Sequence, residues 1–194
     1  MSAYRIVVMG GSYNPVHIGH MLLADYMVQF LGFDETWMML SPRNPLKQDA
    51  CDMASDASRL EMLKIACRDT RHVKPCDVEL SLPRPSYSIT SLTRLQEQHP
   101  DCSFRFLIGS DNWLSFSRWR EPQQILDRFK PIVYMRPGYP VDEKTLPEGV
   151  TLVREPVFEI SSTFIRRGIA SGRDMRLYLP EGVWQYITEH NLYR

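Results

Sequence analysis

The chain has 194 residues, a length that suits one compact domain or one domain with a small C-terminal addition. Hydrophobic residues make up 43% and charged residues 24%, so the sequence can fold around its own apolar core. Because 23 basic residues balance 23 acidic ones, the composition excludes a general nucleic-acid or membrane-surface binder, which needs a large positive field.

Strand-like and helix-like segments alternate along most of the chain, which predicts an α/β fold with an open parallel sheet and crossover helices. The predicted strands cover residues 4–9, 35–40, 73–78, 104–108 and 131–135. The predicted helices between them cover residues 17–30, 55–67 and 89–98. In the first of these helices, helical spacing predicts an inward-facing apolar stripe of Leu22, Leu23, Tyr26, Met27 and Phe30.

After residue 135 the composition and the predicted elements differ from those of the first part of the chain. Residues 136–149 are rich in Pro and Gly, which predicts a surface loop. A short strand at 151–154, a helix at 162–171 and a last helix at 180–190 follow, with Pro180 at the start of the last one. We expect one domain over residues 1–194, with a core of about 1–135 and a helical extension of about 150–194.

The N-terminus and the cysteines indicate a cellular compartment. No signal-peptide pattern precedes the first strand, and no apolar stretch approaches the ~18 residues of a membrane helix. Cys51, Cys67, Cys76 and Cys102 show no Cys-x-x-Cys spacing, which argues against a zinc ribbon or redox pair. We therefore expect reduced thiols and a cytoplasmic protein.

The first strand runs into the segment GGSYNPVHIGH at residues 10–20. Gly10 and Gly11 allow the backbone to approach a ligand and to take positive φ. The helix that follows points its free N–H groups and positive dipole end at the same place. The segment is neither Gly-x-Gly-x-x-Gly nor a Walker A loop, so it predicts an anion site of another kind.

Two histidines lie at the start of that helix. His17 and His20 are three residues apart and therefore share one face of the first turn. A histidine pair in a strand–loop–helix context favours contact with phosphate. Zinc is a weaker alternative, because no third ligand is apparent nearby.

Two later segments also combine a turn with hydrogen-bonding groups. FLIGSDN, residues 106–112, ends an inner strand, where Gly109 permits close approach and Asp111 can accept hydrogen bonds from ribose hydroxyls or cap a helix. ISSTFIR, residues 160–166, places three hydroxyls at a helix start and Arg166 one turn later. Helix capping explains the hydroxyls but not the arginine.

These motifs together resemble a known family. His-x-Gly-His after Gly-Gly resembles the nucleotidyltransferase superfamily, whose members bind ATP on a Rossmann-like sheet. From residue 5 to residue 192 the chain is similar to the bacterial nicotinate-nucleotide adenylyltransferases, with the motifs in the expected order. The resemblance implies an enzyme that transfers AMP from ATP to nicotinate mononucleotide, giving deamido-NAD and pyrophosphate in NAD biosynthesis.

The resemblance also implies three groups of site residues. The expected catalytic residues are His17, His20, Lys47 and Arg166. The expected ATP-binding residues are Gly10, Gly11, Ser12, Tyr13, Gly109, Asp111, Ile160, Ser161, Ser162 and Thr163. The expected acceptor-binding residues are Asn14, Lys47, Ser86, Tyr87, Ser88 and Trp119, with Trp113 as a competitor for the stacking role of Trp119.

The chain departs from the family pattern at two of these sites. The family usually carries His before the lysine of the proline-rich loop, where this chain has Leu46, so only Lys47 is transferred from the resemblance. The family often has Thr where this chain has Ser88, which keeps the hydroxyl.

The expected chemistry needs positioning and charge neutralisation. The attacking phosphate has a second pKa of ~6 and is already mostly ionised at neutral pH, so no general base is required. His17, His20, Lys47 and Arg166 would neutralise charge together with Mg²⁺ that the ATP phosphates hold, without metal ligands from the protein. Both substrates, ATP and nicotinate mononucleotide, are small molecules.

Three alternatives stay open. The acceptor can instead be nicotinamide mononucleotide or phosphopantetheine, and a non-catalytic nucleotide sensor can share the same fold. The sequence does not determine the oligomeric state, so a homo-oligomer is open as well.

Overall fold

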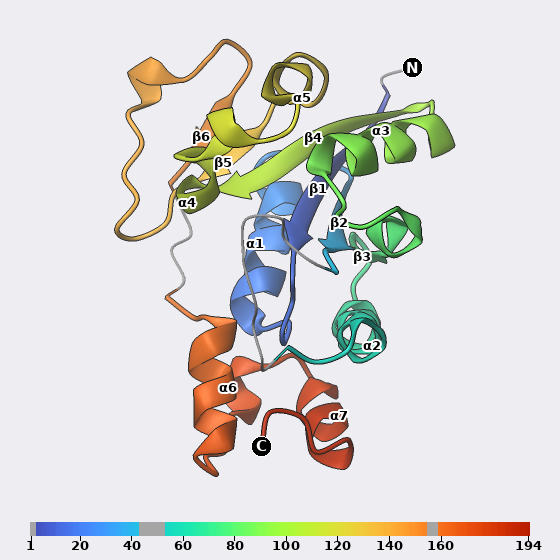
Figure 1. The fold of residues 1–194 in the computed structure, drawn as a ribbon, viewed down its shortest axis with the longest axis vertical. Helices are drawn as coiled ribbons and strands as arrows, with labels where there is room; N and C mark the ends of the chain where they lie inside the picture. Colours follow the sequence, from blue (N-terminus) through green and yellow to red (C-terminus); the bar gives the residue numbers. More distant parts are fainter. Residues whose placement is uncertain (1–2, 43–52, 155–158) are drawn as a thin grey trace.

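A computed structural model describes residues 3–42, 53–154 and 159–194. In it, six parallel strands form one sheet in the order β3-β2-β1-β4-β5-β6 (Figure 1). The strands are β1 (Tyr4–Gly11), β2 (Glu35–Leu40), β3 (Val73–Cys76), β4 (Cys102–Gly109), β5 (Ile132–Tyr134) and β6 (Thr151–Val153). The predicted α/β fold with an open, Rossmann-like parallel sheet is confirmed.

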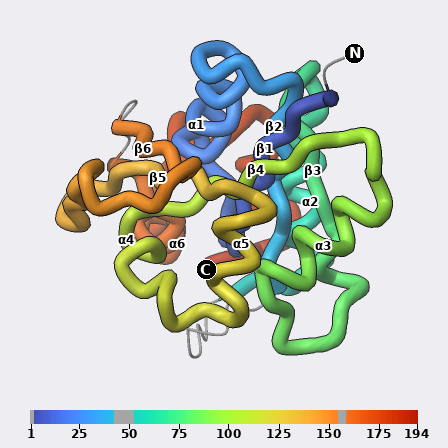
Figure 2. Tube along the Cα trace, turned by 90° about the horizontal axis from the view of Figure 1, so that it is seen from above, coloured from blue at the N-terminus to red at the C-terminus, as the bar shows by residue number. Residues whose placement is uncertain are grey.

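Helices cover both faces of this sheet. One face carries α1 (Ile18–Gln29), α2 (Asp56–Cys67), α6 (Ser162–Ala170) and α7 (Val183–Glu189). The other carries α3 (Ser88–Gln98) and α5 (Pro122–Phe129), so that α1 and α5 lie on opposite sides in Figure 2. Short helical turns complete the order: η1 (Val78–Ser81), α4 (Ser110–Trp113), η2 (Phe116–Arg118), η3 (Glu143–Thr145) and η4 (Arg176–Tyr178).

The central strand β1 is apolar on both faces. Val7 and Met9 pack into one core cluster, whereas Ile6 and Val8 pack into the other. All four side chains are buried, as expected for a parallel strand with helices on both sides. The continuous apolar run at the start of the sequence therefore encodes the middle of the sheet.

The order of the strands creates the place for a ligand. The chain builds β2 and β3 on one side of β1 and then returns to add β4 on the other side. The connections that leave β1 and β4 therefore diverge, and a crevice opens at the carboxyl ends of these two strands. Both Gly-containing motifs lie at this edge, because Gly10, Gly11 and Gly109 end β1 and β4.

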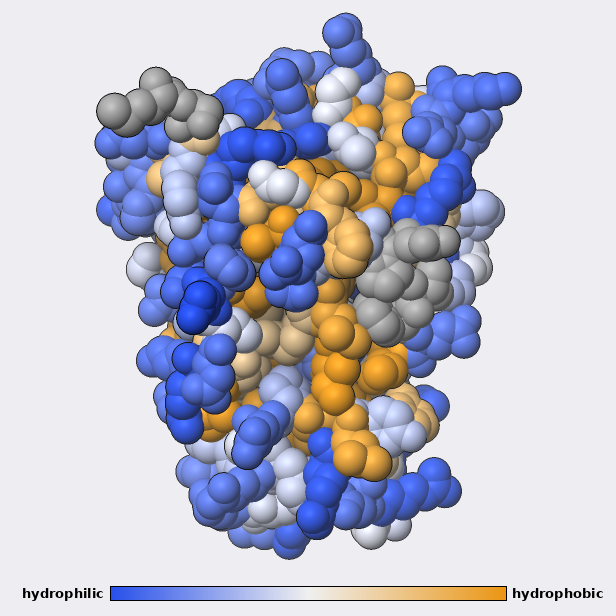
Figure 3. Space-filling view, turned by 180° about the vertical axis from the view of Figure 1, so that it is seen from behind, coloured by the Kyte–Doolittle hydropathy of each residue, from blue (hydrophilic) through white to orange (hydrophobic). Residues whose placement is uncertain are grey.

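The inward-facing stripe predicted for α1 is partly wrong. Leu23 and Met27 are buried, together with Gly19 and Ala24, but Leu22 and Phe30 are exposed. The buried side of α1 is therefore lined by smaller residues than expected, and Phe30 instead stacks on Tyr26 at the surface. Apolar residues do reach the surface of this protein, where Figure 3 shows a band of them on the face opposite to that of Figure 1.

Some element boundaries differ from the prediction. The third strand ends at Cys76 rather than at residue 78, because the chain turns into η1 and buries Val78. The last helix begins at Val183 rather than at Pro180, because Gly182 has φ +80° and interrupts the helical path. The helix α5, which the sequence analysis did not include, buries Ile125 and Phe129 against β4.

The two C-terminal helices pack on the rest of the molecule. Ile165 of α6 and Val183 of α7 belong to the same buried cluster as Val7. Figure 1 shows α6 and α7 together at the end of the molecule opposite the N-terminus. This packing supports our proposal that the chain forms one domain. No helix in the described ranges is long and apolar enough to span a membrane.

Candidate active site

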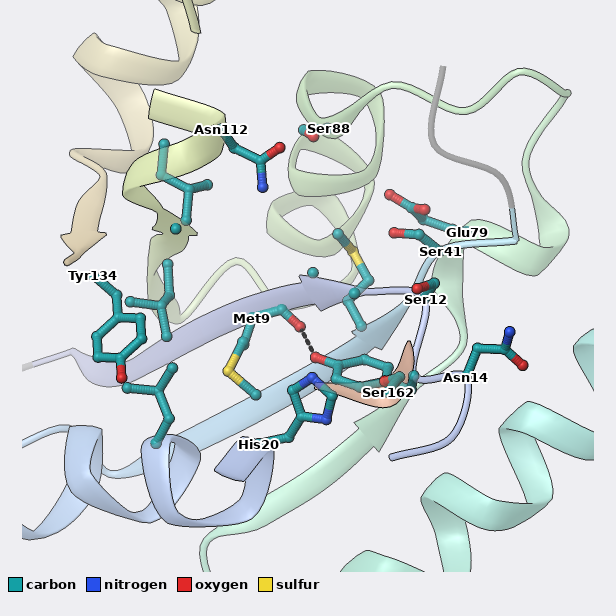
Figure 4. Close-up of a pocket in the computed structure, with 18 of the residues that line it drawn as sticks. Met9, Ser12, Asn14, His20, Ser41, Glu79, Ser88, Asn112, Tyr134 and Ser162 are labelled. Atoms are coloured by element: carbon teal, nitrogen blue, oxygen red, sulfur yellow. Dashed lines mark hydrogen bonds between the residues drawn. The ribbon is translucent and has the colours of Figure 1, made fainter. Parts of the chain in front are cut away.

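A cavity of about 900 Å³ opens at the carboxyl ends of β1 and β4 (Figure 4). This volume lies within the range of natural small-molecule sites, at its upper end. Of the predicted site residues, the following line it: Gly10, Gly11, Ser12, Tyr13, Asn14, His17, His20, Ser86, Tyr87, Ser88, Gly109, Trp119, Ile160, Ser161, Ser162, Thr163 and Arg166. Segments that are far apart in the sequence therefore meet around one space.

Two predicted residues do not appear in this lining. Asp111 lies beside the cavity and Asn112 reaches it instead. Lys47 lies outside the described residues, as does Leu46, so its predicted contacts stay predictions.

The loop after β1 is shaped by Tyr13 rather than by its glycines. Tyr13 has φ +43°, whereas Gly10 and Gly11 do not adopt positive φ, so that part of the prediction is wrong. The buried Tyr13 hydroxyl donates a 2.5 Å hydrogen bond to the carbonyl oxygen of Met9. A Cβ on Gly11 would meet the Tyr13 ring at 2.9 Å, so this glycine makes room for the tyrosine.

His17 and His20 lie at the start of α1 with their rings stacked. The ring centroids are 3.6 Å apart and the planes differ by 21°. The backbone N–H of His17 donates to Nδ1 of His20 over 3.2 Å. In the neutral ring of His20 the proton therefore resides on Nε2, which can donate to an anionic oxygen in the cavity.

Both imidazoles are neutral at pH 7. Burial and, to a smaller extent, the Arg136 guanidinium lower the pKa of His17 to about 4. Burial, His17 and Arg136 lower the pKa of His20 well below its usual value. The expectation that these histidines help to neutralise phosphate charge concerns the ATP complex and stays a prediction, because in the present state the surroundings disfavour the imidazolium form. They supply hydrogen-bonding groups.

Arginines supply the charge in the cavity instead. Among the described residues its lining includes five of them: Arg84, Arg118, Arg120, Arg136 and Arg166. The one carboxylate in that described lining belongs to Glu79. A chain with no net charge thus concentrates positive charge at one crevice, which favours an anionic ligand.

The start of α6 closes one side of the cavity. Ser161 is its N-cap and accepts a hydrogen bond from the N–H of Phe164, while Ser162 donates to the carbonyl oxygen of Pro15. Arg166 donates over 2.9 Å to the carbonyl oxygen of Asn14. These contacts fix α6 against the loop that carries the histidines. The segments at residues 10–20 and 160–166 are therefore in contact with each other.

Asn14 connects three distant segments. Its side-chain oxygen accepts a 3.0 Å hydrogen bond from the N–H of Ala54 and a 2.7 Å hydrogen bond from the hydroxyl of Tyr193. Its main-chain oxygen is the partner of Arg166. The buried Asn14 thus has a positioning role, which the sequence analysis did not foresee beside its predicted contact with the acceptor.

The end of β4 holds an ion pair that the sequence analysis missed. Arg136, which follows β5, donates over 3.2 Å to one carboxylate oxygen of Asp111. The other carboxylate oxygen is buried and has no hydrogen-bond partner in the described structure. A side chain at Gly109 would collide with both residues, so this glycine makes room for the ion pair.

The opposite side of the cavity is aromatic. Trp119 packs against Phe106 and Phe116, and its Nε1–H is buried without a partner among the described residues. Its competitor Trp113 stacks on Phe116 and is not in the lining. Trp119 is therefore the tryptophan that can contact a bound ring in this cavity.

Glu79 is a buried acid in this wall that sequence reasoning missed. Its carboxylate accepts hydrogen bonds from the hydroxyls of Ser86, over 3.3 Å, and Ser91, over 2.8 Å. Burial raises the pKa of Glu79, while hydrogen bonds from Ser91, Ser41 and Ser86 oppose the shift. The acid joins η1 to the start of α3, and Figure 4 shows it beside Ser41.

Arg59 is fully buried beneath the cavity. Its guanidinium donates to four main-chain oxygens and also pairs with the carboxylate of Asp56. The four oxygens belong to Ser12, Ser41, Pro42 and Ala54. Arg59 therefore ties the loop after β1 to both flanks of residues 43–52. No sequence motif marked it.

The described residues offer no protein cage for a metal ion. No group of three or more His, Cys, Asp and Glu side chains gathers within the described ranges. The zinc alternative for the histidine pair therefore finds no third ligand there.

Comparison with known proteins agrees with this geometry. The cytidylyltransferase-like family model matches residues 8–168. The chain is 43% identical to a protein of Bacteroides fragilis, over 97% of this chain and 94% of the relative, and 44% identical to one of Bacteroides thetaiotaomicron, over 94% and 90%. Both relatives are named probable nicotinate-nucleotide adenylyltransferase.

Solved structures share the fold. Plasmodium falciparum nicotinic acid mononucleotide adenylyltransferase, complexed with NaAD, has a TM-score of 0.79 at 21% identity, with 97% of both chains covered. The same enzyme complexed with APC has a TM-score of 0.76 at 23% identity, with 98% of this chain and 97% of that chain covered. The match over most of the chain, together with the curated relatives, shows that this protein belongs to the cytidylyltransferase-like family and, within it, to the nicotinate-nucleotide adenylyltransferases.

Proposed function

We propose that the cavity at the ends of β1 and β4 binds ATP and nicotinate mononucleotide and joins them into deamido-NAD, as a step of NAD biosynthesis. The observation that carries this proposal is the convergence of the stacked His17 and His20 with Arg166 around one crevice. The names of the curated relatives support the identity of the acceptor.

ATP occupies the side formed by the β1 loop, the end of β4 and the start of α6. His20 donates from Nε2 to the α-phosphate, and His17 and Arg166 hold the triphosphate together with Lys47. The loop around the phosphates is formed by Gly10, Gly11, Ser12 and Tyr13. All of these residues except Lys47 line the cavity, which supports this placement of ATP.

The nucleoside part of ATP lies between β4 and α6 in this proposal. Gly109 and Asp111 lie on the side of the ribose, and the segment Ile160–Ser161–Ser162–Thr163 contacts the adenine edge and the phosphates. Asp111 adjoins Gly109, which lines the cavity, and this position supports the ribose assignment.

The acceptor lies toward the aromatic wall. Trp119 stacks on the pyridine ring, the segment Ser86–Tyr87–Ser88 receives the ring substituent, and Asn14 and Lys47 contact the remainder. The start of α3 supports this assignment, since N–H groups at a helix start favour an anion such as a carboxylate.

The reaction follows from this arrangement without a general base. A phosphate oxygen of nicotinate mononucleotide attacks the α-phosphorus of ATP. The new O–P bond forms as the bond to the β-phosphate oxygen breaks, and pyrophosphate leaves with the bonding electron pair. The arginines offset the repulsion between the two anions, while the histidines donate hydrogen bonds to oxygens whose charge grows in the transition state.

A divalent metal ion accompanies ATP in enzymes of this chemistry, and we propose Mg²⁺ here. The cavity fits an ion held by triphosphate oxygens and water, since its described lining contains one carboxylate and that carboxylate is engaged by serines. The ion would neutralise phosphate charge. A cytoplasmic location stays a prediction, and the oligomeric state stays open.

Pyrophosphate release tests the proposal. The enzyme would be supplied with ATP and Mg²⁺ and with nicotinate mononucleotide, nicotinamide mononucleotide, phosphopantetheine or no acceptor. We expect release that depends on the acceptor and is fastest with the acid. Fast release with another acceptor would replace the assigned substrate, and ATP binding without release would indicate a nucleotide sensor.

A further inference from the structure

Arg120 stands at the acceptor side of the cavity, and the proposed reaction gives it no contact of its own beyond the shared positive charge of the arginines. Its guanidinium carbon lies 4.8 Å from the centroid of the Tyr87 ring, and the residue lines the cavity. Trp119 precedes it in the chain. Arg120 therefore joins the two parts of the acceptor side, the tryptophan and the loop at residues 86–88.

The contact with Tyr87 holds a long and otherwise mobile side chain. A guanidinium over an aromatic face is attracted by the ring quadrupole and keeps its charge directed along the ring. Glu121 pairs with Arg120 over 3.6 Å, and both side chains are exposed, so this carboxylate screens Arg120 without burying it. The positive charge therefore remains available at the mouth of the cavity.

The two rival acceptors differ in one feature that such a charge can distinguish. Nicotinate mononucleotide carries a carboxylate on its pyridine ring, whereas nicotinamide mononucleotide carries a neutral amide. Their phosphates and riboses are the same. A fixed positive charge near the ring substituent favours the acid, while the hydroxyls of the Ser86–Ser88 loop can bind either group.

We propose that Arg120, held over Tyr87, is a specificity-determining residue that favours a carboxylate on the acceptor ring over an amide. This inference rests on the proposed function and extends it from the shape of the acceptor site to its charge.

The test compares kcat/KM for the two mononucleotides in wild type, Arg120→Gln and Arg120→Lys. We expect Arg120→Gln to lower the acid-to-amide ratio of kcat/KM roughly five-fold, since one partly exposed charge has about this effect. The change should come mainly from a lower kcat/KM for the acid. Arg120→Lys keeps the charge and should retain most of the ratio. The ratio of the wild type, but not that of Arg120→Gln, should fall with added salt.

Two matched controls separate charge from other effects. Arg94→Gln removes the same charge from the exposed face of α3, outside the lining, and should leave the ratio unchanged. Glu121→Gln removes the screening carboxylate and should not lower the ratio, and a lower ratio would overturn an effect of the Arg120 charge. Arg120 is itself exposed, so melting temperatures should stay within a few degrees.

The outcomes distinguish this proposal from the proposed function. If the wild type favours the acid and Arg120→Gln keeps that preference, the role of Arg120 is overturned and the enzyme assignment stands. An equal loss of kcat/KM with both acceptors would also overturn it, because the charge would then act on a group that both acceptors carry. If the wild type favours the amide, both proposals fail.

Discussion

The hydroxyl of Tyr193, the penultimate residue, donates a 2.7 Å hydrogen bond to the side-chain oxygen of Asn14 in the loop that carries the histidines. Residues 179 positions apart are thereby joined next to the cavity. The same asparagine accepts from Ala54 and Arg166, so the C-terminus helps to hold the contacts on which the site depends.

The first prediction concerns this link. Tyr193→Phe keeps the ring but removes the donor, and we expect a loss of about 1 kcal/mol in unfolding free energy and a higher KM for ATP. Urea denaturation and initial rates would measure both. Tyr186→Phe, on the same C-terminal segment, is the matched control and should change neither. If the two variants have the same unfolding free energy and the same KM for ATP, a role for the Tyr193 hydroxyl is refuted.

The second prediction concerns the buried guanidinium of Arg59, whose removal should lower the unfolding free energy more than the loss of the Tyr193 hydroxyl does. Arg59→Met leaves four main-chain oxygens without their donor and Asp56 without its buried partner, so we expect a loss of roughly 3–5 kcal/mol. Chemical denaturation would measure it. Arg84→Met removes the exposed partner of the same Asp56 and should cost less than about 1 kcal/mol. Similar losses in both variants would contradict the assigned role of Arg59.

A third prediction concerns acid pH. The pKa of His17 is about 4 in the folded protein and 6.5 in an unfolded chain, so the unfolded state binds more protons between these values. Stability should therefore be full above pH 6.5 and fall as the pH drops toward 4, by roughly 3 kcal/mol from this residue. Denaturation of wild type and His17→Gln at several pH values would measure the slope. An identical acid slope in the variant would contradict the neutral buried imidazole.

The buried Glu79 gives a fourth prediction. Glu79→Gln replaces one acceptor oxygen by an NH₂ group, so at least one of the serine hydroxyls that donate to Glu79 loses this acceptor. We expect KM for the acceptor to rise roughly tenfold, with KM for ATP nearly unchanged. Steady-state kinetics would separate the two constants, and Glu97→Gln on the exposed face of α3 is the control. An equal rise in both KM values would refute a role confined to the acceptor side.

The sequence alone predicted most of the fold, because its signals are local. Buried strands such as β1 appear as short apolar runs, and α3 shows its three core residues at helical spacing. The missed α5 also had local signals, Pro122 at its first position and Ile125 and Phe129 four residues apart. The boundary at Gly182 instead depended on a backbone conformation that composition does not specify.

The site was predictable where motifs adjoin strand ends, and less so elsewhere. Gly-rich turns and hydroxyl-rich helix starts pointed to the residues that now line the cavity. Glu79, Arg59 and Arg136 were missed because their roles arise from tertiary contacts, in which partners come from distant segments. The neutral state of His17 likewise results from burial, which a motif does not reveal.

The most direct test of the central claim follows the AMP group itself. ATP labelled with ³²P at the α-phosphate would be incubated with nicotinate mononucleotide, Mg²⁺ and either wild-type enzyme or His20→Ala, and the products separated. We predict that the wild type transfers the label to deamido-NAD and that His20→Ala does so at least a hundredfold more slowly, since it loses a donor to the reacting phosphate. Label that stays in ATP with the wild-type enzyme, or equal transfer by the variant, would contradict this account of the cavity.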